Sequence, residues 1–205
     1  MPITNGYATL AEVKAALRIP VADTVDDDLL EIAIESASRQ IDGFCERVFY
    51  DVGSETRYYS ADSASLCFID DLQSISSLTT SSDGETWDTT WTATDYSLEP
   101  LNGLAGGLAS PYTRIRAIGD YLFPTYANPD IHTSDPSVRV VGTWGYAEIP
   151  SAVRQATILY SMRQFKRYDS PLGIAGFGDI GAMRVGRIDP DVEAMLSPFR
   201  RLGMG

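Results

Sequence analysis

Three glycines, Gly176, Gly178 and Gly181, have the spacing of a dinucleotide-binding fingerprint. In that fingerprint the glycines let backbone amides approach a pyrophosphate, and the motif works only between a strand and the helix of a βαβ unit. Here the glycines follow a long helical pattern and lie in a glycine-rich segment, residues 170–186. This context favours a segment that threads along a neighbouring subunit, so we expect no cofactor.

The single histidine and the acidic runs do not form a catalytic or metal-binding pattern. His132 stands beside Pro129 and Asp130, with no cysteine or second histidine near it. The runs 26–28 and 70–71 lack the alternating ligands and the tight glycine turn of a calcium loop. We interpret the first run as a helix N-terminus and the second as a turn at a strand end. No spacing among the 28 acidic residues singles out a hydrolytic carboxylate pair. The sequence therefore predicts no catalytic residue, no metal site and no enzyme.

The two cysteines and three tryptophans fit a protein core. Cys45 and Cys67 fall on an apolar helical face and inside a strand pattern, so we expect both to be reduced and buried. Trp87, Trp91 and Trp144 occur at strand spacing, where aromatic residues commonly pack across strands or at interfaces. The alternative is that such aromatic side chains stack on sugars or bases.

Helical patterns open and close the chain. The capping box of Thr9 and Glu12 begins a short helix that Pro20 ends. A second helix of about twenty residues begins at Thr24 and Asp27, with apolar residues on one side as far as Val48. Two further helices are predicted by proline at their first turn. Pro150 begins a long helix, and Asp189–Pro190 begins a short one.

Between the helices the hydrophobic period changes to two, which indicates strands. Asp83–Gly84 predicts a hairpin turn, 101–110 a flexible loop, and 123–136 a long proline-rich connection. The predicted fold class is α+β: a helical frame with a β-rich insertion between its second and third helices. We expect a helical core from residues 1–50 and 150–205, and an insertion from 51–149. The strand-like runs are 56–59, 66–69, 74–79, 85–91, 96–98, 113–118 and 137–142.

The chain of 205 residues has a net charge of −12 that is unevenly spread. Residues 1–50 carry nine acidic and four basic residues, 51–149 fourteen and four, and 150–205 five and eight. An acidic body argues against wrapping nucleic acid, which requires a basic face. It suits a surface that repels DNA, or a head-to-tail contact between a basic tail and an acidic body, although acidity also aids solubility. No apolar run approaches the roughly 20 residues of a membrane span, and no secretory signal is visible, so we expect a chain made in the cytoplasm.

Several segments within residues 7–167 occur in a characteristic order: 44–49, 72–78 with Asp83–Gly84, 95–98, 138–141, Gly145–Tyr146, Ile149–Pro150 and 153–156. Together they resemble the phage head–tail connector (adaptor) family. The resemblance implies a ring, commonly of twelve subunits, that docks beneath the portal of a long-tailed phage. It implies helices as the ring core, a C-terminal segment that engages the portal, and no catalytic residues. DNA would pass through the channel without specific binding, and the ring would lie at the head–tail junction of the virion.

The sequence thus predicts a structural adaptor that contacts copies of itself, the portal protein, and a downstream tail or stopper protein. The alternative is a β-rich ligand-binding or carbohydrate-binding module that uses Trp87, Trp91 and Tyr96. We expect the basic C-terminal third to be a docking arm. Its candidate contact residues are Arg163, Lys166, Arg167, Arg184, Arg187, Phe199, Arg200 and Arg201.

Overall fold

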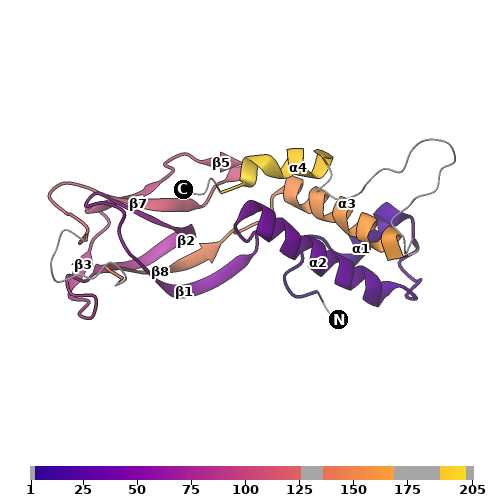
Figure 1. Cartoon of the computed structure of the whole chain (residues 1–205), viewed down its shortest axis with the longest axis horizontal. Coiled ribbons are helices and arrows are strands. Elements are labelled where there is room, and N and C mark those ends of the chain that lie inside the picture. Colours follow the sequence, from indigo (N-terminus) through magenta and orange to yellow (C-terminus); the bar gives the residue numbers. More distant parts are fainter. Residues whose placement is uncertain (1–2, 126–135, 169–189, 202–205) are drawn as a thin grey trace. The chain divides into compact units, whose positions relative to one another are not determined.

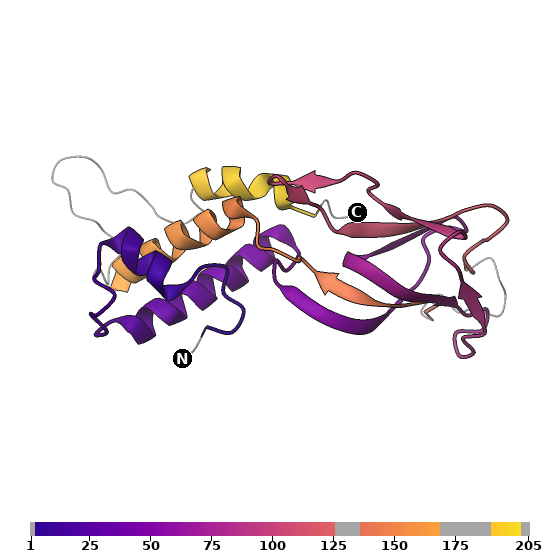
Figure 2. The ribbon, with the colours of Figure 1, turned by 180° about the vertical axis from the view of Figure 1, so that it is seen from behind.

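The computed structural model describes residues 3–125, 136–168 and 190–201, and its fold class is α+β as predicted. The chain divides into two compact units, each described here by itself. A helical unit comprises Met1–Phe49 and Ile149–Gly205, and a β unit comprises Tyr50–Glu148. Figures 1 and 2 show the helices and the strands from opposite sides. Among the described residues, no helix has both the length and the apolar character that crossing a bilayer requires.

The helical unit begins with α1 (Leu10–Leu17), whose predicted capping box is confirmed. The Thr9 hydroxyl accepts from the Glu12 amide at 3.3 Å, and the Glu12 carboxylate accepts from the Thr9 amide at 2.7 Å. Two of the amides left unpaired at a helix start are thereby satisfied. Arg18, in the left-handed region at φ 61°, ends the helix before Pro20.

The helix α2 (Asp27–Cys45) starts without the side-chain cap that the sequence suggested. Its N-cap is Asp26, which makes no side-chain capping bond, and the Asp27 amide reaches only the Thr24 carbonyl oxygen at 3.4 Å. Glu46, at φ 56°, ends the helix, so the helical pattern that extended to Val48 overshoots by about one turn.

Two further helices complete this unit: α3 (Ser151–Tyr168) and α4 (Pro190–Leu196), which continues into a 3-10 turn, η1 (Ser197–Phe199). Leu30, near the start of α2, belongs to the same core cluster as Met162 and Phe165, near the end of α3. The two helices therefore run in opposite directions, as Figures 1 and 2 show. Pro150 lies immediately before the first residue of α3, where its missing amide hydrogen costs no helical bond.

The β unit contains an antiparallel sheet in the order β1-β8-β2-β7-β4, with β3 paired to β2. A separate hairpin is formed by β5 and β6. The strands are β1 (Asp51–Tyr59), β2 (Leu66–Thr80), β3 (Thr89–Trp91), β4 (Tyr96–Glu99), β5 (Leu104–Ala105), β6 (Leu108–Ala109), β7 (Tyr112–Ala117) and β8 (Val138–Gly145).

Several of the predicted segments of the β unit differ from the structure, and β1 begins at Asp51, five residues before the predicted run 56–59. The runs 66–69 and 74–79 belong to one strand, β2, because register shifts after Phe68 and Leu72 let it continue through the intervening acidic residues. Of the run 85–91, only the last three residues form a strand. The predicted loop 101–110 contains the β5–β6 hairpin, which a bond from the Ser110 amide to the Gly103 carbonyl closes at 2.8 Å.

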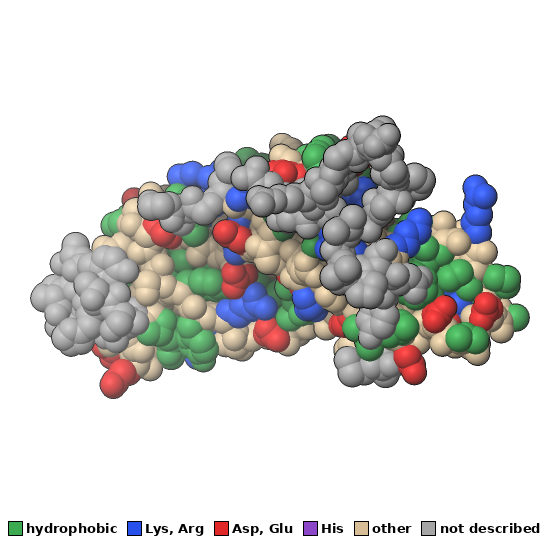
Figure 3. Space-filling view, turned by 45° about the vertical axis from the view of Figure 1, so that its right-hand side comes forward, with side chains coloured by type: hydrophobic (Ala, Val, Ile, Leu, Met, Phe, Trp, Pro, Cys, Tyr) green, Lys and Arg blue, Asp and Glu red, His purple; other side chains and the backbone are tan. Residues whose placement is uncertain are grey.

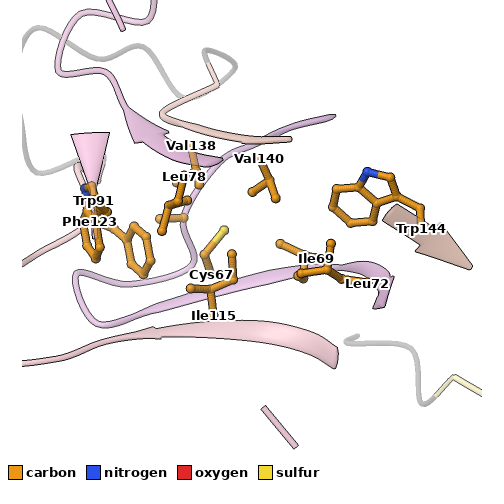
Figure 4. Close-up of a cluster of buried hydrophobic side chains, with 11 residues drawn as sticks. Cys67, Ile69, Leu72, Leu78, Trp91, Ile115, Phe123, Val138, Val140 and Trp144 are labelled. Carbon is orange, nitrogen blue, oxygen red and sulfur yellow. The ribbon is translucent and has the colours of Figure 1, made fainter. Parts of the chain in front are cut away.

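Buried side chains from β2, β7 and β8 form the core of the β unit (Figure 4). Cys67, Ile115 and Val140 are each fully buried within it, and Trp144 donates its indole N–H to the Glu55 carbonyl at 3.0 Å. Burying such side chains stabilises the fold by roughly 1.5–3 kcal/mol each. Both cysteines are free and buried, as predicted.

At the end of β8, Gly145 is required by the backbone. It has φ +85°, and a Cβ there would overlap the Tyr50 carbonyl oxygen. The Tyr146 amide also donates to that oxygen at 3.2 Å. A side chain at position 145 would therefore force apart the start of β1 and the end of β8.

Candidate assembly surfaces

No cluster of three or more His, Cys, Asp or Glu side chains that could hold a metal ion occurs in the part of the chain that the structure describes. The acidic runs have structural partners instead. Asp27 forms an ion pair with Lys14, and Asp70 accepts from Arg57 at 3.0 Å and from the Tyr59 hydroxyl at 3.1 Å. Asp70 lies within β2, so the strand-end turn expected there is absent. His132 and the Gly176–Gly181 motif lie outside the described residues.

The ion pair of Lys14 and Asp27 fixes the connection between α1 and α2. The Lys14 side chain is only 2% exposed, which is unusual for a lysine. Its ammonium group also donates to the Val21 carbonyl at 3.2 Å. A buried ammonium group without a partner would be strongly destabilising. The pair therefore holds residues 18–26 in place, and this segment exposes Val21 and Val25.

A second network joins the N-terminal segment to the end of α2. The buried Tyr7 hydroxyl donates to the Asp42 carboxylate and accepts from the Phe49 amide at 2.8 Å. The Tyr7 amide donates to the Ser38 hydroxyl at 3.0 Å, and Arg39 approaches Asp42 at 3.1 Å. Burial, followed by the Asp42 hydrogen bond, raises the pKa of Tyr7 well above its ordinary value. Burial also raises the pKa of Asp42, against the opposing effects of Tyr7 and Arg39.

The C-terminal segment is anchored to the C-terminal end of α2. Phe199 is 2% exposed and packs edge-to-face against Phe49, with ring centroids 5.7 Å apart. The Arg201 amide donates to the Cys45 carbonyl at 2.9 Å, and the Arg200 guanidinium carbon lies 5.1 Å from the centre of the Phe44 ring. Guanidinium groups are favourable at this end of a helix, where the macrodipole is negative.

The residues predicted to contact partners therefore have different environments. Lys166 and Arg167 are exposed near the end of α3, and Arg163 on the same helix is half-buried. Arg200 is exposed, Arg201 is half-buried, and Phe199 lies in the core of the helical unit. A partner contact by any of them stays a prediction. Arg184 and Arg187 lie outside the described residues.

The three aromatic residues of the ligand-binding alternative do not share one exposed surface. Trp91 is 5% exposed, stacks on Phe123 with ring centroids 4.6 Å apart, and donates its indole N–H to the Thr80 hydroxyl at 3.0 Å. Tyr96 packs against the same core cluster. Only Trp87 remains on the sheet surface, where Arg139 lies over its ring. Trp91 is thus a core residue, as the sequence favoured, so the alternative is wrong for Trp91, and a ligand contact by Trp87 or Tyr96 stays a prediction.

The edge of the sheet formed by β4 and β7 carries a cluster of charged side chains, of which Arg116 is exposed and Arg114 and Glu99 are half-buried. Glu99 pairs with Arg114 at 2.8 Å and with Arg116 at 2.6 Å. The hydrogen bond from Arg116 is the largest of the effects that lower the pKa of Glu99. Just beyond this cluster, Leu101 and Leu104 are largely exposed. Charged groups at an edge strand discourage indiscriminate pairing with other strands.

A known protein family matches the N-terminal part of the chain by sequence. The family model described as "Phage gp6-like head-tail connector protein" matches residues 7–67. That family is one of connector proteins and not of enzymes, in agreement with the sequence. No curated protein sequence matches the chain significantly.

Solved assemblies contain chains of the same fold. A chain in the neck of an empty gene transfer agent (GTA) particle, computed with C6 symmetry, matches 100% of this chain and 94% of its own length, with 18% identity and a TM-score of 0.56. A chain in the virion of a native GTA particle matches 95% and 90%, with 19% identity and a TM-score of 0.51. A chain in the neck of a native GTA particle, computed with C12 symmetry, matches 95% and 89%, with 16% identity and a TM-score of 0.51.

The TM-scores show a shared fold, and the family model adds a sequence match over residues 7–67, which include α1 and α2 with the two buried networks. The resemblance to phage head–tail connector proteins is therefore confirmed by sequence over residues 7–67, and the fold is similar to that of chains from GTA particles.

Proposed function

We propose that this chain is a structural head–tail connector, which forms a ring between the capsid portal and the tail of a phage or phage-like particle. The match of the connector family model to residues 7–67 is the observation that carries the proposal. The likeness of the whole fold to chains from neck assemblies computed with C6 and C12 symmetry supports a ring at the head–tail junction. Cyclic symmetry of this kind follows when one surface of a subunit binds a different surface of the next.

The helical unit has the internal bracing that a ring subunit needs. Lys14, on α1, pairs with Asp27, and Tyr7, in the N-terminal segment, bonds to Asp42, so each ties a neighbouring part of the chain to α2 through a buried side chain. Contacts that hold such segments in one conformation lower the entropy lost when subunits associate. We infer that α1, α2 and α3 present fixed surfaces to neighbouring subunits.

The basic C-terminal third acts as the docking arm toward the portal. Phe199 serves as its anchor and not as its contact, since the ring is buried against Phe49. Arg200, Lys166 and Arg167 supply exposed positive charge for an acidic partner surface. Reversing Arg184 and Arg187 to Glu should weaken portal binding at low and moderate salt, and Arg18→Glu, at an exposed position after α1, is the matched control. Unchanged binding of the double variant would reject the arm.

Passage of DNA requires a channel wall that does not trap phosphates. Residues 51–149 carry fourteen acidic and four basic residues, so this part of each subunit repels DNA on average. In the proposed assembly it faces or flanks the channel, and DNA passes without specific binding. The downstream partner is a tail or stopper protein.

Inactivation of the chain in the producing cell tests the role directly. Electron microscopy should show packaged or emptied heads and free tails that are not joined, and joined particles should return when the wild-type chain is supplied in trans. Joined, infectious particles in the absence of the chain would reject the proposed function.

A further inference from the structure

We propose that the outer face of α2 binds the basic face of α3 on a neighbouring copy of this chain. The inference deepens the proposed ring, because it names the two surfaces that meet. Val25 and Ile32 are 88% and 51% exposed, unlike most large apolar residues of the helical unit. At the right of Figure 3, over the helical unit, exposed apolar side chains lie beside acidic ones.

Ile32 belongs to a line of residues along α2. Leu29, Ile32, Ser36 and Gly43 follow spacings of three, four and seven residues, which place them along one stripe of the helix, and Val25 lies in the turn just before its N-cap, Asp26. The stripe faces away from the unit's own core, which α2 contacts through Leu30, Ile34 and other buried residues. A second apolar or small-residue stripe on a helix is the pattern expected when two helices pack against it from opposite sides.

Gly43 adds an independent observation. A glycine inside an exposed helix costs about 1 kcal/mol relative to alanine. A Cβ at this position would meet nothing within 4 Å, so the helical unit itself does not require the glycine. The open space is what a neighbouring backbone would occupy at close approach.

Charge complementarity identifies the occupant as a second copy. Acidic residues flank the stripe near the start of α2, at Asp28, Glu31 and Glu35. The last turns of α3 carry Arg163 and Lys166 beside the partly exposed Leu159. Opposite charges around an apolar centre favour one register and disfavour like-with-like contact.

The two faces also lie at the same end of the helical unit, since α2 and α3 run in opposite directions. A contact between two different faces at one level is compatible with a closed ring of identical subunits. An isologous dimer would instead bring one acidic face against another. The geometry therefore favours a head-to-tail contact of α2 with α3.

A charge swap tests this contact. Ile32→Lys places a cation against Arg163 and Lys166 of the next copy and removes an apolar contact, so association should weaken at least about tenfold. Lys166→Glu places an anion against the acidic face and should weaken association similarly. Both positions are solvent-accessible, so neither variant should change the thermal midpoint of the isolated chain.

Each variant is defective alone, but an equimolar mixture should assemble. In a ring in which the two variants alternate, there are two kinds of contact. At one, the lysine introduced at position 32 meets the glutamate introduced at position 166 of the next copy. At the other, both positions keep their wild-type residues. Mass photometry with the portal protein present measures the outcome, and Leu104→Lys in the β unit is the exposed apolar control. The inference would be overturned if both single variants assembled as well as the wild-type chain, or if the mixture failed to assemble. A wild-type chain that never assembles would instead reject the proposed ring.

Discussion

The buried ion pair of Lys14 and Asp27 gives the sharpest test of the energetics. Lys14 is 2% exposed, whereas Asp27 is 25% exposed, so the two partners differ in their access to water. Asp27→Asn leaves a buried ammonium group without its counter-charge, while Lys14→Met leaves a carboxylate on a side chain that is 25% exposed, although its Oδ1 atom is buried. The two substitutions break one interaction but should have unequal costs.

Removing one partner of a buried pair typically costs 3–5 kcal/mol, and the partial exposure of Asp27 reduces this to about 2–3 kcal/mol for Asp27→Asn. For Lys14→Met we expect about 1 kcal/mol or less, because the methionine side chain fills the same apolar site. The double variant should resemble Lys14→Met, which gives a coupling energy of about 2 kcal/mol.

Urea denaturation followed by circular dichroism at 222 nm reports on the helices, since Trp87, Trp91 and Trp144 all lie in the β unit. A loss of 2–3 kcal/mol corresponds to a midpoint lowered by about 1 M. Asp28→Asn is the matched control in the same helical turn and should cost less than about 1 kcal/mol. Equal costs for Asp27→Asn and Lys14→Met would refute the reasoning.

Three further predictions concern the cap of α1, the core of the β unit and one carboxylate. Thr9→Ala removes the capping box with Glu12 and should cost about 1 kcal/mol, measured as the thermal midpoint at 222 nm; no change would mean that α1 does not depend on its cap. Trp91→Ala should cost about 3–5 kcal/mol because the indole is buried against Phe123, and tryptophan fluorescence of the wild-type chain should not respond to added sugars. Hydrogen bonds from the Thr86 and Glu85 amides and from the Ser81 hydroxyl hold the pKa of Asp83 well below its ordinary value. The stabilisation that they give is present above the unfolded pKa near 4 and is lost as pH falls toward the folded value. In an NMR titration the Asp83 carboxyl should therefore stay ionised through about pH 4, and a normal midpoint there would contradict these bonds.

Local signals in the sequence were sufficient for the helical frame. The capping box at Thr9, the proline at position 150 and the apolar spacing of α2 each depend on residues within two or three turns. Such signals specify a helix before any tertiary contact forms. The end of α2 was missed because the left-handed conformation of Glu46 has no glycine to mark it.

Long-range pairing was less predictable. The single strand β2 passes through Asp70 and Asp71, which read as a turn until their pairing with neighbouring segments is known. Arg57 and Tyr59 come from β1 and place their polar groups on Asp70, so an acidic residue is accommodated within the sheet. Period-two patterns identify strands but do not reveal which partner satisfies a charge.

The buried polar groups of the helical unit were also missed. Lys14 stands beside Val13 on the inner side of α1, and its position next to apolar residues was the one available signal. Its partner Asp27 lies thirteen residues further on, in the acidic run 26–28. Because a helix N-terminus already explained that run, there was no reason in the sequence to look for an ion pair there. The basic residues of the docking arm could be identified from the sequence by their charge. The burial of Phe199 could not, because it depends on packing against Phe49.

The mass of the assembly formed by the purified chain with its portal protein tests the central claim most directly. The account predicts a discrete ring, of about 270 kDa before the portal is counted if twelve copies of the 22.4 kDa chain close it. A chain that remains a 22.4 kDa monomer at every concentration, with and without the portal, would contradict the account.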